Sequence, residues 1–136
     1  MTPIQMAKIH AAAFTKQRPW SETEFAKLIQ SKHVFIIANS QCFVLGRAIA
    51  DEVELLTLAT DPEQRRRGHA QDCLDRFHQE ARARQASTSL LEVALDNQAA
   101  CRLYQNNRYS IVAERPNYYR RPNGQCIAAL IMSRAL

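Results

Sequence analysis

The sequence predicts an α+β fold in αβα layers, built on a mixed central sheet. Three short apolar runs, residues 33–38, 42–50 and 53–60, are separated only by brief polar turns. Runs of this length and spacing are typical of strands joined by hairpins, so they predict an N-terminal antiparallel meander. Later in the chain, a long helical pattern leads into an apolar run at residues 89–95. A strand, a helix and a strand in this order predict a C-terminal βαβ crossover with a parallel pair.

The length of 136 residues predicts a single domain, residues 1–136, with one hydrophobic core. No apolar run approaches the ~18 residues of a membrane span, and the N-terminus lacks the charged-then-apolar order of a signal peptide. We therefore expect a cytoplasmic protein that has no membrane segment. The cysteines fall within predicted helices and strands without a C-x-x-C pair, so we expect reduced, mostly buried thiols. They are Cys42, Cys73, Cys101 and Cys126.

Two helices are predicted before the meander. Residues 4–14 have helical apolar spacing, and the pair Arg18-Pro19 ends that pattern. Ser21-x-x-Glu24 is a capping box, which starts a second helix. The apolar positions expected to face inward are Met6, Ile9, Ala13, Phe14, Phe25, Leu28 and Ile29.

The second half of the chain continues with a long helix and three strands. The run at residues 89–95 is nearly continuous in its apolar character, which predicts a strand buried on both faces. Asp96-Asn97 then caps a further helix, and strands are expected at residues 109–113 and 126–132 around a turn at residues 122–124. The inward positions of the two helices are Ala70, Cys73, Leu74, Phe77 and Ala81 in the first, and Ala100, Leu103 and Tyr104 in the second.

Residues 61–74, DPEQRRRGHAQDCL, join a predicted strand to the long helix through a basic turn with one glycine. The first N–H groups of a helix have no intrahelical partner, so this turn predicts an anion site that suits phosphate. Its pattern is Arg65-x-x-Gly68-x-Ala70, which is neither a Walker loop nor a Rossmann glycine motif. An ordinary exposed helix N-terminus is the alternative reading of these residues.

The net charge of +5 is carried mainly by arginine, which favours bidentate contacts with phosphate or carboxylate. Nucleic acid, a phosphorylated cofactor, and an acidic or ribosomal surface are partners that suit this charge. The arginines are spread over residues 65–67, 82–84 and 115–121, with no lysine-rich tail and aromatics interleaved only at Tyr118-Tyr119. We therefore expect no direct binding of nucleic acid.

Three polar residues in the second half are candidates for chemistry. Glu92 is the only charge in its apolar strand, and an ionised carboxylate there is costly unless it faces a cleft or the solvated edge of the sheet. Asn97 and Tyr104 are seven positions apart, so they share one helical face, although Tyr104 could equally be core packing. His69 and Cys73 are one helical turn apart, but no third ligand accompanies them, so we expect no metal site.

Three elements downstream of the basic turn carry a family resemblance. They are Leu91-Glu92-Val93, Asn97-x-Ala99-Ala100 and Leu103-Tyr104, in this order and spacing after Arg65-x-x-Gly68-x-Ala70. With these elements, the chain resembles the RimI-type N-terminal protein acetyltransferases of the GNAT superfamily over residues 13–132. Pro19-Trp20-Ser21, Asp61-Pro62 and Arg115-x-Asn117-Tyr118-Tyr119 extend the resemblance.

The resemblance implies the GNAT acyltransferase fold, acetyl-CoA as co-substrate, and the N-terminal α-amine of a protein as acceptor. The acceptor that it favours is the N-terminal alanine of a small-subunit ribosomal protein. It makes Glu92 the general base and Tyr104 the proton donor to the departing thiolate. It assigns the backbone of Leu58, Ala59 and Thr60 to the pantetheine arm. It assigns the pyrophosphate to Arg66, Arg67, Gly68, His69, Ala70 and Gln71, and a further cofactor contact to Asn97.

The chain departs from the family pattern in four places. The usual first strand is almost absent, Ala70 replaces a glycine, residues 106–109 lack a glycine before Tyr109, and an acidic residue before the last strand is missing. Two alternatives therefore stay open, namely a GNAT enzyme that acetylates a small-molecule amine and a CoA-binding module without catalysis. The oligomeric state is not predicted by any feature of the sequence.

Overall fold

The computed structural model describes all 136 residues, which form four α-helices, one short 3₁₀ helix and six strands. In chain order they are α1 (Pro3–Ala13), α2 (Glu22–Gln30), β1 (Val34–Ala38), β2 (Cys42–Ile49), β3 (Glu52–Thr60), η1 (Pro62–Gln64), α3 (His69–Ala83), β4 (Thr88–Ala94), α4 (Gln98–Asn106), β5 (Ser110–Arg120) and β6 (Cys126–Ala135). None of the helices combines the length and the apolar character that crossing a membrane requires.

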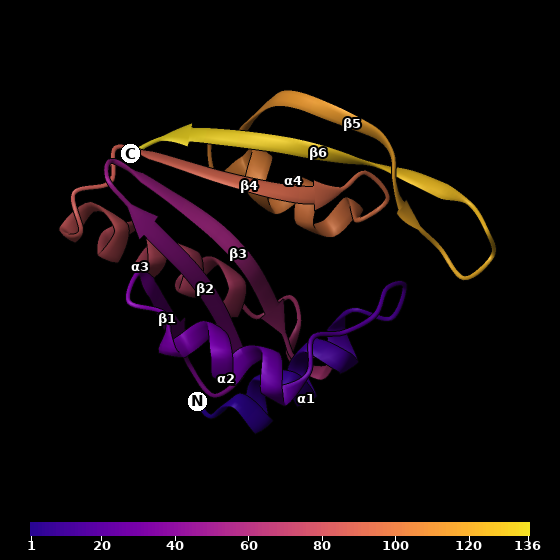
Figure 1. Cartoon of the computed structure of the whole chain (residues 1–136), viewed down its shortest axis with the longest axis horizontal. Helices are drawn as coiled ribbons and strands as arrows, with labels where there is room; N and C mark the ends of the chain where they lie inside the picture. The colour runs from indigo at the N-terminus through magenta and orange to yellow at the C-terminus, as the bar shows by residue number, and fades with distance from the viewer.

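The strands form one mixed sheet in the order β1-β2-β3-β4-β6-β5. Strands β1, β2 and β3 pair antiparallel, which confirms the predicted meander. Strand β4 runs parallel to β3, and α3 connects the two, which confirms the crossover. Only Glu52–Leu55 of β3 pair with Thr88–Leu91 of β4. Beyond those residues the two strands diverge, as Figure 1 shows, and the sheet opens into a V.

A β-bulge lies where the strands begin to diverge. Leu45 of β2 pairs with Thr57, but the next residue, Gly46, pairs with Leu55, so Leu56 is an extra residue in β3. Bulges bend a strand and increase its twist, and this one directs β3 away from β4. Gly46 itself is required by packing, because a Cβ there would lie 2.5 Å from the ring of Phe77 in α3.

Helices cover both faces of the sheet. On one face, α3 and α4 enclose the larger apolar cluster, which includes Val53, Leu55, Phe77, Leu91 and Tyr104. On the other face, α1 and α2 cover only the meander, with Met6, Phe25, Phe43, Leu45 and Ala59. Figure 1 shows the resulting asymmetry, since nothing comparable to α1 and α2 lies over β4, β6 and β5 on that side.

Local signals in the sequence place several element ends correctly. The capping box of Ser21 and Glu24 starts α2, and the Asn97 side chain accepts the N–H of Ala100 at the start of α4. Gly68 precedes α3 with a φ of +81°, a left-handed conformation that glycine adopts at little cost. Each of these residues thus sets the start of a helix through a side-chain bond or a backbone angle within a few positions of itself.

Several expectations about strands and burial were wrong. Strand β4 is not buried on both faces, because Glu92 is exposed and Leu90 is only half-buried. Strand β5 extends to Arg120 instead of ending at Ala113, although Ser110–Tyr118 are all exposed. Its hydrogen bonds to β6, and not an apolar pattern, hold it in place. Strand β6 likewise continues past Met132 to Ala135.

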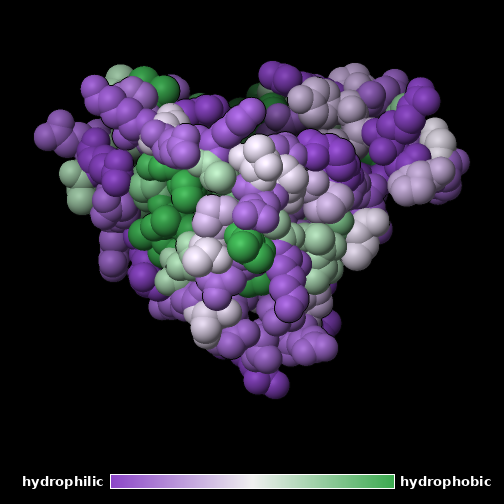
Figure 2. Space-filling model, turned by 60° about the horizontal axis from the view of Figure 1, so that its bottom comes forward, coloured by the Kyte–Doolittle hydropathy of each residue, from purple (hydrophilic) through white to green (hydrophobic).

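Two expectations about individual side chains also need correction. Ile29 is exposed, because the inward face of α2 is centred on Phe25 and does not include it. Cys42 and Cys73 are buried free thiols, but Cys101 is half-buried and Cys126 is exposed. Elsewhere the surface is largely hydrophilic, with apolar residues gathered in one area of the face that Figure 2 presents.

A buried chain of polar groups joins α3 to the C-terminal strands. Arg134 donates to Nδ1 of His78 at 3.0 Å, so Nε2–H of His78 donates to the Tyr109 hydroxyl at 2.8 Å. That hydroxyl also pairs with the Ser89 hydroxyl at 2.7 Å. Burial, reinforced by the charge of Arg134, lowers the pKa of His78 to about 4. His10 in α1 is also buried, and burial lowers its pKa to about 4 as well.

We expect the free energy of unfolding to fall as the pH drops from about 6.5 towards 4. Unfolded histidine binds its proton near pH 6.5, whereas folded His10 and His78 bind theirs only near pH 4. The unfolded state therefore gains protons in this window, and the stabilisation present above pH 6.5 is lost as the pH falls. Each histidine contributes on the order of 3 kcal/mol over the full window. Urea denaturation between pH 7 and pH 5 measures the slope.

The exposed His33 provides the control. His78→Gln should reduce the slope by about one proton, and His33→Gln should leave it unchanged. Ring-proton titrations that placed His10 and His78 near pH 6.5 would contradict the expectation.

Candidate active site

A cavity of about 430 Å³ lies where β3 and β4 diverge. Its walls come from α1 and the following loop, from β3 and β4, from α4, and from the β5–β6 hairpin. Residues separated by more than one hundred positions in the sequence thus face one space. The polar groups among them are His10, Thr15, Lys16, Gln17, Thr57, Arg65, Glu92, Asp96, Asn97, Tyr104, Tyr118, Tyr119 and Arg121.

Beyond Leu55, the edge of β3 that faces β4 has no strand partner. The opposite edge stays paired with β2 through Thr60. Leu58 lines the cavity, whereas Ala59 and Thr60 are buried. These last two residues can therefore meet a ligand only through their backbone. A free strand edge offers N–H and C=O groups at regular spacing, which suits a ligand with amide groups of its own.

The N-terminus of α3 is also open to a ligand. No side chain caps this helix, and its first intrahelical bond runs from the N–H of Asp72 to Gly68, so the N–H groups of His69, Ala70 and Gln71 have no protein acceptor. A Cβ at Gly68 would meet no atom within 4 Å, so the approach to these groups is unobstructed. Uncapped N–H groups beside exposed Arg66 and Arg67 fit a phosphate or pyrophosphate group.

Two predicted cofactor residues already use their side chains within the protein. Gln71 and Asn107 exchange two amide hydrogen bonds, of 2.7 and 2.9 Å, and Gln71 also donates to Asp75. Asn97 uses its side-chain oxygen to cap α4. Gln71 therefore has its backbone N–H to offer, and Asn97 has its Nδ2 group.

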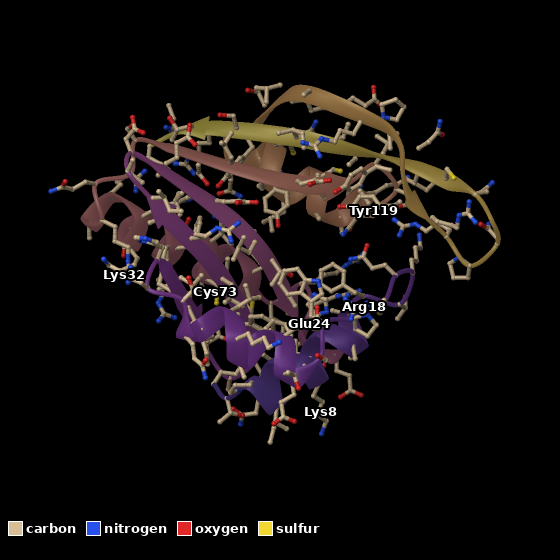
Figure 3. The ribbon with its side chains drawn as sticks, in the orientation of Figure 1. Lys8, Arg18, Glu24, Lys32, Cys73 and Tyr119 are labelled. Atoms are coloured by element: carbon tan, nitrogen blue, oxygen red, sulfur yellow. The ribbon has the colours of Figure 1, made fainter.

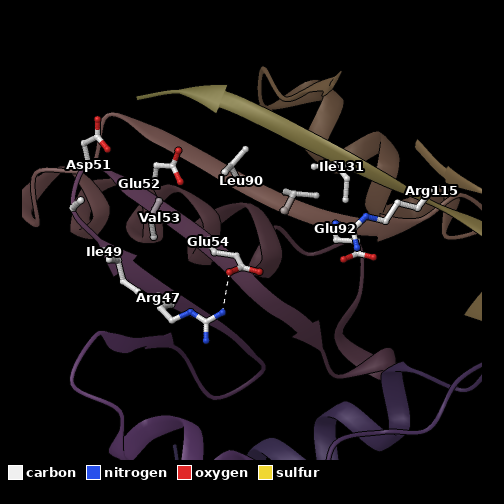
Figure 4. Close-up of a pocket in the computed structure, with 12 residues that line it drawn as sticks. Arg47, Ile49, Asp51, Glu52, Val53, Glu54, Leu90, Glu92, Arg115 and Ile131 are labelled. Atoms are coloured by element: carbon white, nitrogen blue, oxygen red, sulfur yellow. Dashed lines mark hydrogen bonds and ion pairs between the residues drawn. The ribbon is translucent and has the colours of Figure 1, made fainter. Parts of the chain in front are cut away.

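Glu92 lies on the strand edge of the cavity and also lines a second hollow of about 570 Å³. Figure 4 shows its carboxylate directed away from β6 into the open space, with Arg115 nearby and Glu54 across the hollow. Glu54 itself is paired with Arg47 at 2.9 Å. The side chain of Glu92 makes no ion pair or hydrogen bond with another residue, so its carboxylate can accept a proton from a molecule that enters the cavity.

Tyr104 lines the same cavity from α4. Its side chain is nearly buried, with 5% of the residue exposed, and its ring packs edge-on against Tyr109 with centroids 5.6 Å apart. Burial raises the pKa of Tyr104, so its phenol stays protonated at neutral pH. No hydrogen bond within the protein engages this hydroxyl, which leaves its proton available to a ligand.

The α1–α2 connection contributes an aromatic wall that was not expected from the sequence. His10 stacks on Phe14 and Trp20, with centroids 4.3 and 5.2 Å apart, and its Nδ1 accepts the N–H of Trp20 at 3.1 Å. His10 falls on the same helical stripe as Met6 and Phe14, and this spacing was the available signal. In Figure 3, Arg18 and Glu24 mark this side of the opening and Tyr119 marks the opposite side.

Arg65 and Arg121 were also missed as wall residues of the cavity. Arg121 pairs with Asp96, 25 positions earlier, and no local pattern in the sequence indicates such a contact. His69 and Cys73 do not converge with other possible ligands, since no group of three or more His, Cys, Asp or Glu side chains lies within metal-binding reach.

Comparisons with known proteins agree with this arrangement. The model of the acetyltransferase (GNAT) family matches residues 5–108. The chain is 30% identical to a ribosomal protein bS18-alanine N-acetyltransferase of Haemophilus ducreyi, over 85% of this chain and 82% of that protein. It is 28% identical to the enzyme of the same name from Escherichia coli, over 92% of this chain and 90% of that protein.

Solved structures give the same result. The crystal structure of the ribosomal-protein-S18-alanine N-acetyltransferase from Escherichia coli superposes with a TM-score of 0.87, covering 98% of this chain and 86% of that one at 28% identity. The NatC complex bound to Gag peptide and CoA shares the fold, with a TM-score of 0.82 at 15% identity over 99% of this chain and 91% of that one. The family match, the relatives and the fold establish that this chain belongs to the GNAT acetyltransferases and uses acetyl-CoA as its co-substrate.

Proposed function

We propose that this protein transfers the acetyl group of acetyl-CoA to the α-amine at a protein N-terminus, with the N-terminal alanine of ribosomal protein bS18 as its favoured acceptor. The observation that carries the proposal is the position of Glu92 and Tyr104 on two walls of one cavity, at the point where β3 and β4 diverge. The names of the relatives support the acceptor. We further infer that residues 1–136 act as one domain in the cytoplasm, where ribosomal proteins are made.

In this proposal, acetyl-CoA binds to the uncapped N-terminus of α3 and to the free edge of β3. The backbone N–H groups of His69, Ala70 and Gln71, together with Arg66 and Arg67, would hold the pyrophosphate beside Gly68. The backbone of Leu58, Ala59 and Thr60 would bond the amide groups of the pantetheine arm. Asn97 would contribute Nδ2. Bound in this way, acetyl-CoA supplies a reactive thioester at the cavity.

Glu92 and Tyr104 divide the two proton transfers between them. Glu92, whose carboxylate is free and solvated, takes the proton that the attacking amine must lose, directly or through water. Tyr104 gives its phenolic proton to the sulfur as the thioester bond breaks. A backbone N–H on the free edge of β3 stabilises the negative charge that develops on the acetyl oxygen. The charges that develop on the amine nitrogen, the acetyl oxygen and the sulfur are therefore each neutralised or stabilised by a separate group.

The first prediction tests the cofactor loop. Gly68→Val places a branched side chain at the open approach to the α3 N–H groups, so acetyl-CoA should raise the melting temperature much less than in the wild type. Gly124→Val is the matched control, because Gly124 also has a positive φ, +85°, and open space around it. That variant should lose a similar amount of stability but keep the full shift with acetyl-CoA. Equal rises in melting temperature with acetyl-CoA in all three proteins would show that the loop does not bind the cofactor.

The second prediction concerns the acceptor. At pH 7, deprotonation costs roughly 1 kcal/mol for an α-amine of pKa about 7.7–8.0 but roughly 4–5 kcal/mol for lysine of pKa about 10.4. A single carboxylate suits the first task, so we expect acetylation of an Ala-first peptide at its N-terminus. The same peptide with a blocked N-terminus and an internal lysine is the control, beside small amines. Mass spectrometry that found comparable rates on lysine or on a small amine would favour the alternative acceptors.

The third prediction tests the two proton transfers. Tyr104→Phe should lower kcat by about 10²–10⁴-fold while acetyl-CoA still binds, because general acid assistance is worth about that much. The hydroxyl has no partner in the protein, so stability should barely change. Tyr109→Phe is the control, since it removes the bonds to His78 and Ser89 and should reduce stability by about 1–3 kcal/mol but spare kcat.

Glu92→Gln should lower kcat to a similar extent, and the loss should ease at high pH, where more of the amine is already neutral. A Tyr104→Phe variant with wild-type kcat, under conditions where chemistry is shown to limit the rate, would make Tyr104 a packing residue only. If Glu92→Gln also kept the wild-type kcat, both proton transfers would belong to other groups.

A further inference from the structure

Arg121 is a buried arginine at the junction of three segments that surround the cavity. Only 8% of the residue is exposed. Its guanidinium makes a two-fold contact with Asp96, with Nε 2.9 Å from Oδ2 and Nη2 2.5 Å from Oδ1. Its third nitrogen, Nη1, donates to the backbone carbonyl of Lys16 at 3.4 Å, and its Cζ lies 5.4 Å from the centre of the Tyr119 ring.

These partners belong to three parts of the chain, of which the β4–α4 turn and the hairpin are already joined by the backbone bond from Leu95 to Ala128, whereas the α1–α2 connection is not. Lys16 is in the α1–α2 connection, Asp96 is in the turn between β4 and α4, and Arg121 follows β5 in the hairpin. The bond to Lys16 is the one hydrogen bond that joins residues 14–20 to anything beyond α1, α2 and their connection. All three residues line the cavity, so the contacts of Arg121 connect three segments of the cavity wall.

Asp96 also connects Arg121 to the helix that carries Tyr104. The neighbouring residue, Asn97, caps α4, and α4 carries Tyr104 seven residues further on. The Arg121 guanidinium holds the pKa of Asp96 below its usual range, so the pair stays ionised at neutral pH. A buried arginine without its carboxylate would be an uncompensated charge, so this pair adds a side-chain link to the backbone pairing that already joins the hairpin and the β4–α4 turn.

We propose that Arg121 is a positioning residue, which holds the α1–α2 connection and the β5–β6 hairpin in fixed positions relative to Glu92 and Tyr104. In this way it determines the shape of the acceptor side of the cavity. This inference rests on the proposed transferase function for its kinetic consequence. Arginine is required because its planar fork makes two parallel bonds to a carboxylate and still has a nitrogen for Lys16. Arg121 makes no hydrogen bond to the cofactor loop at residues 66–71, so we expect the pyrophosphate end of acetyl-CoA to bind without it.

The test compares Arg121→Lys and Asp96→Asn with a matched control, Arg18→Lys. Arg18 lies in the same connection and makes an equally two-fold contact with Glu24, at 2.6 and 3.1 Å, but 70% of its side chain is exposed. Lysine keeps the charge in both arginine variants and removes only the fork. If Arg121→Lys fails to fold, Asp96→Asn carries the test, because it changes one atom and leaves the arginine in place.

The first measurement needs no acceptor. Trp20 is the only tryptophan of the chain and lies in the α1–α2 connection, so acrylamide quenching of its fluorescence reports on the mobility of that segment. We expect stronger quenching in Arg121→Lys and Asp96→Asn than in the wild type, and wild-type quenching in Arg18→Lys. Wild-type quenching in the first two variants, or the same increase in the control, would overturn the proposal.

The second measurement uses transfer to an Ala-first peptide. Misplacement of the acceptor should lower kcat/KM for the peptide by about ten- to a hundredfold in Arg121→Lys, mainly through KM, with an unchanged thermal shift by acetyl-CoA. A parallel loss of the acetyl-CoA shift would show general destabilisation and contradict a positioning role. A wild-type protein that acetylated no peptide would refute the proposed function, while the Trp20 measurement would still decide the role of Arg121 in holding the loop.

Discussion

The separation of β3 from β4 is the constraint on which the rest of the structure depends. Strands in a sheet satisfy their backbone groups against each other, and a buried group left without a partner costs about 1–3 kcal/mol. Here the pairing stops at Leu55 and Leu91, and beyond that point the backbone groups on the facing edges have no strand partner. The carbonyl of Ala94 accepts the N–H of Asn97 instead, and the other groups are left to water or a ligand. The bulge at Leu56 bends β3 away, and Gly46 leaves room for Phe77 to pack beneath the bend. The opening is thus built by specific residues of β2, β3 and α3.

The two halves of the divided sheet are held together from one side. The apolar cluster under α3 and α4 contains Val53 and Leu55 from β3 as well as Leu91 and Val93 from β4, so it joins the halves and closes that face. On the opposite face α1 and α2 cover the meander alone. Access to the divergence point is therefore one-sided for an acceptor, and the Arg121 contact with Lys16 spans that side. The same asymmetry explains why Glu92 is exposed although Leu91 and Val93 beside it are buried.

Sequence reasoning succeeded where the determining interaction is local. Ser21 with Glu24, Asn97 at the start of α4 and Gly68 before α3 act within a few residues of themselves, and the meander follows from apolar runs and turns. The resemblance to a known family supplied the candidate site residues. The apolar pattern predicted that β4 is buried on both faces, and this was wrong. One face of that strand borders an opening that only the tertiary structure creates. The contact of Arg121 with Asp96 and the chain from Arg134 through His78 to Ser89 join distant segments, and no spacing rule encodes them.

The exposed strand β5 has a consequence for how the protein behaves among other copies of itself. It forms the outer edge of the sheet over eleven residues, with Ile111, Val112 and Tyr118 exposed, which is the type of edge that invites aggregation. Pro116 has no N–H to offer a neighbouring chain, Asn117 adopts a φ of +55°, and the register with β6 shifts between Arg115 and Tyr119. These irregularities interrupt any continuous ladder along the edge. An extended hairpin can therefore remain beside the catalytic opening at high protein concentration without recruiting a second sheet.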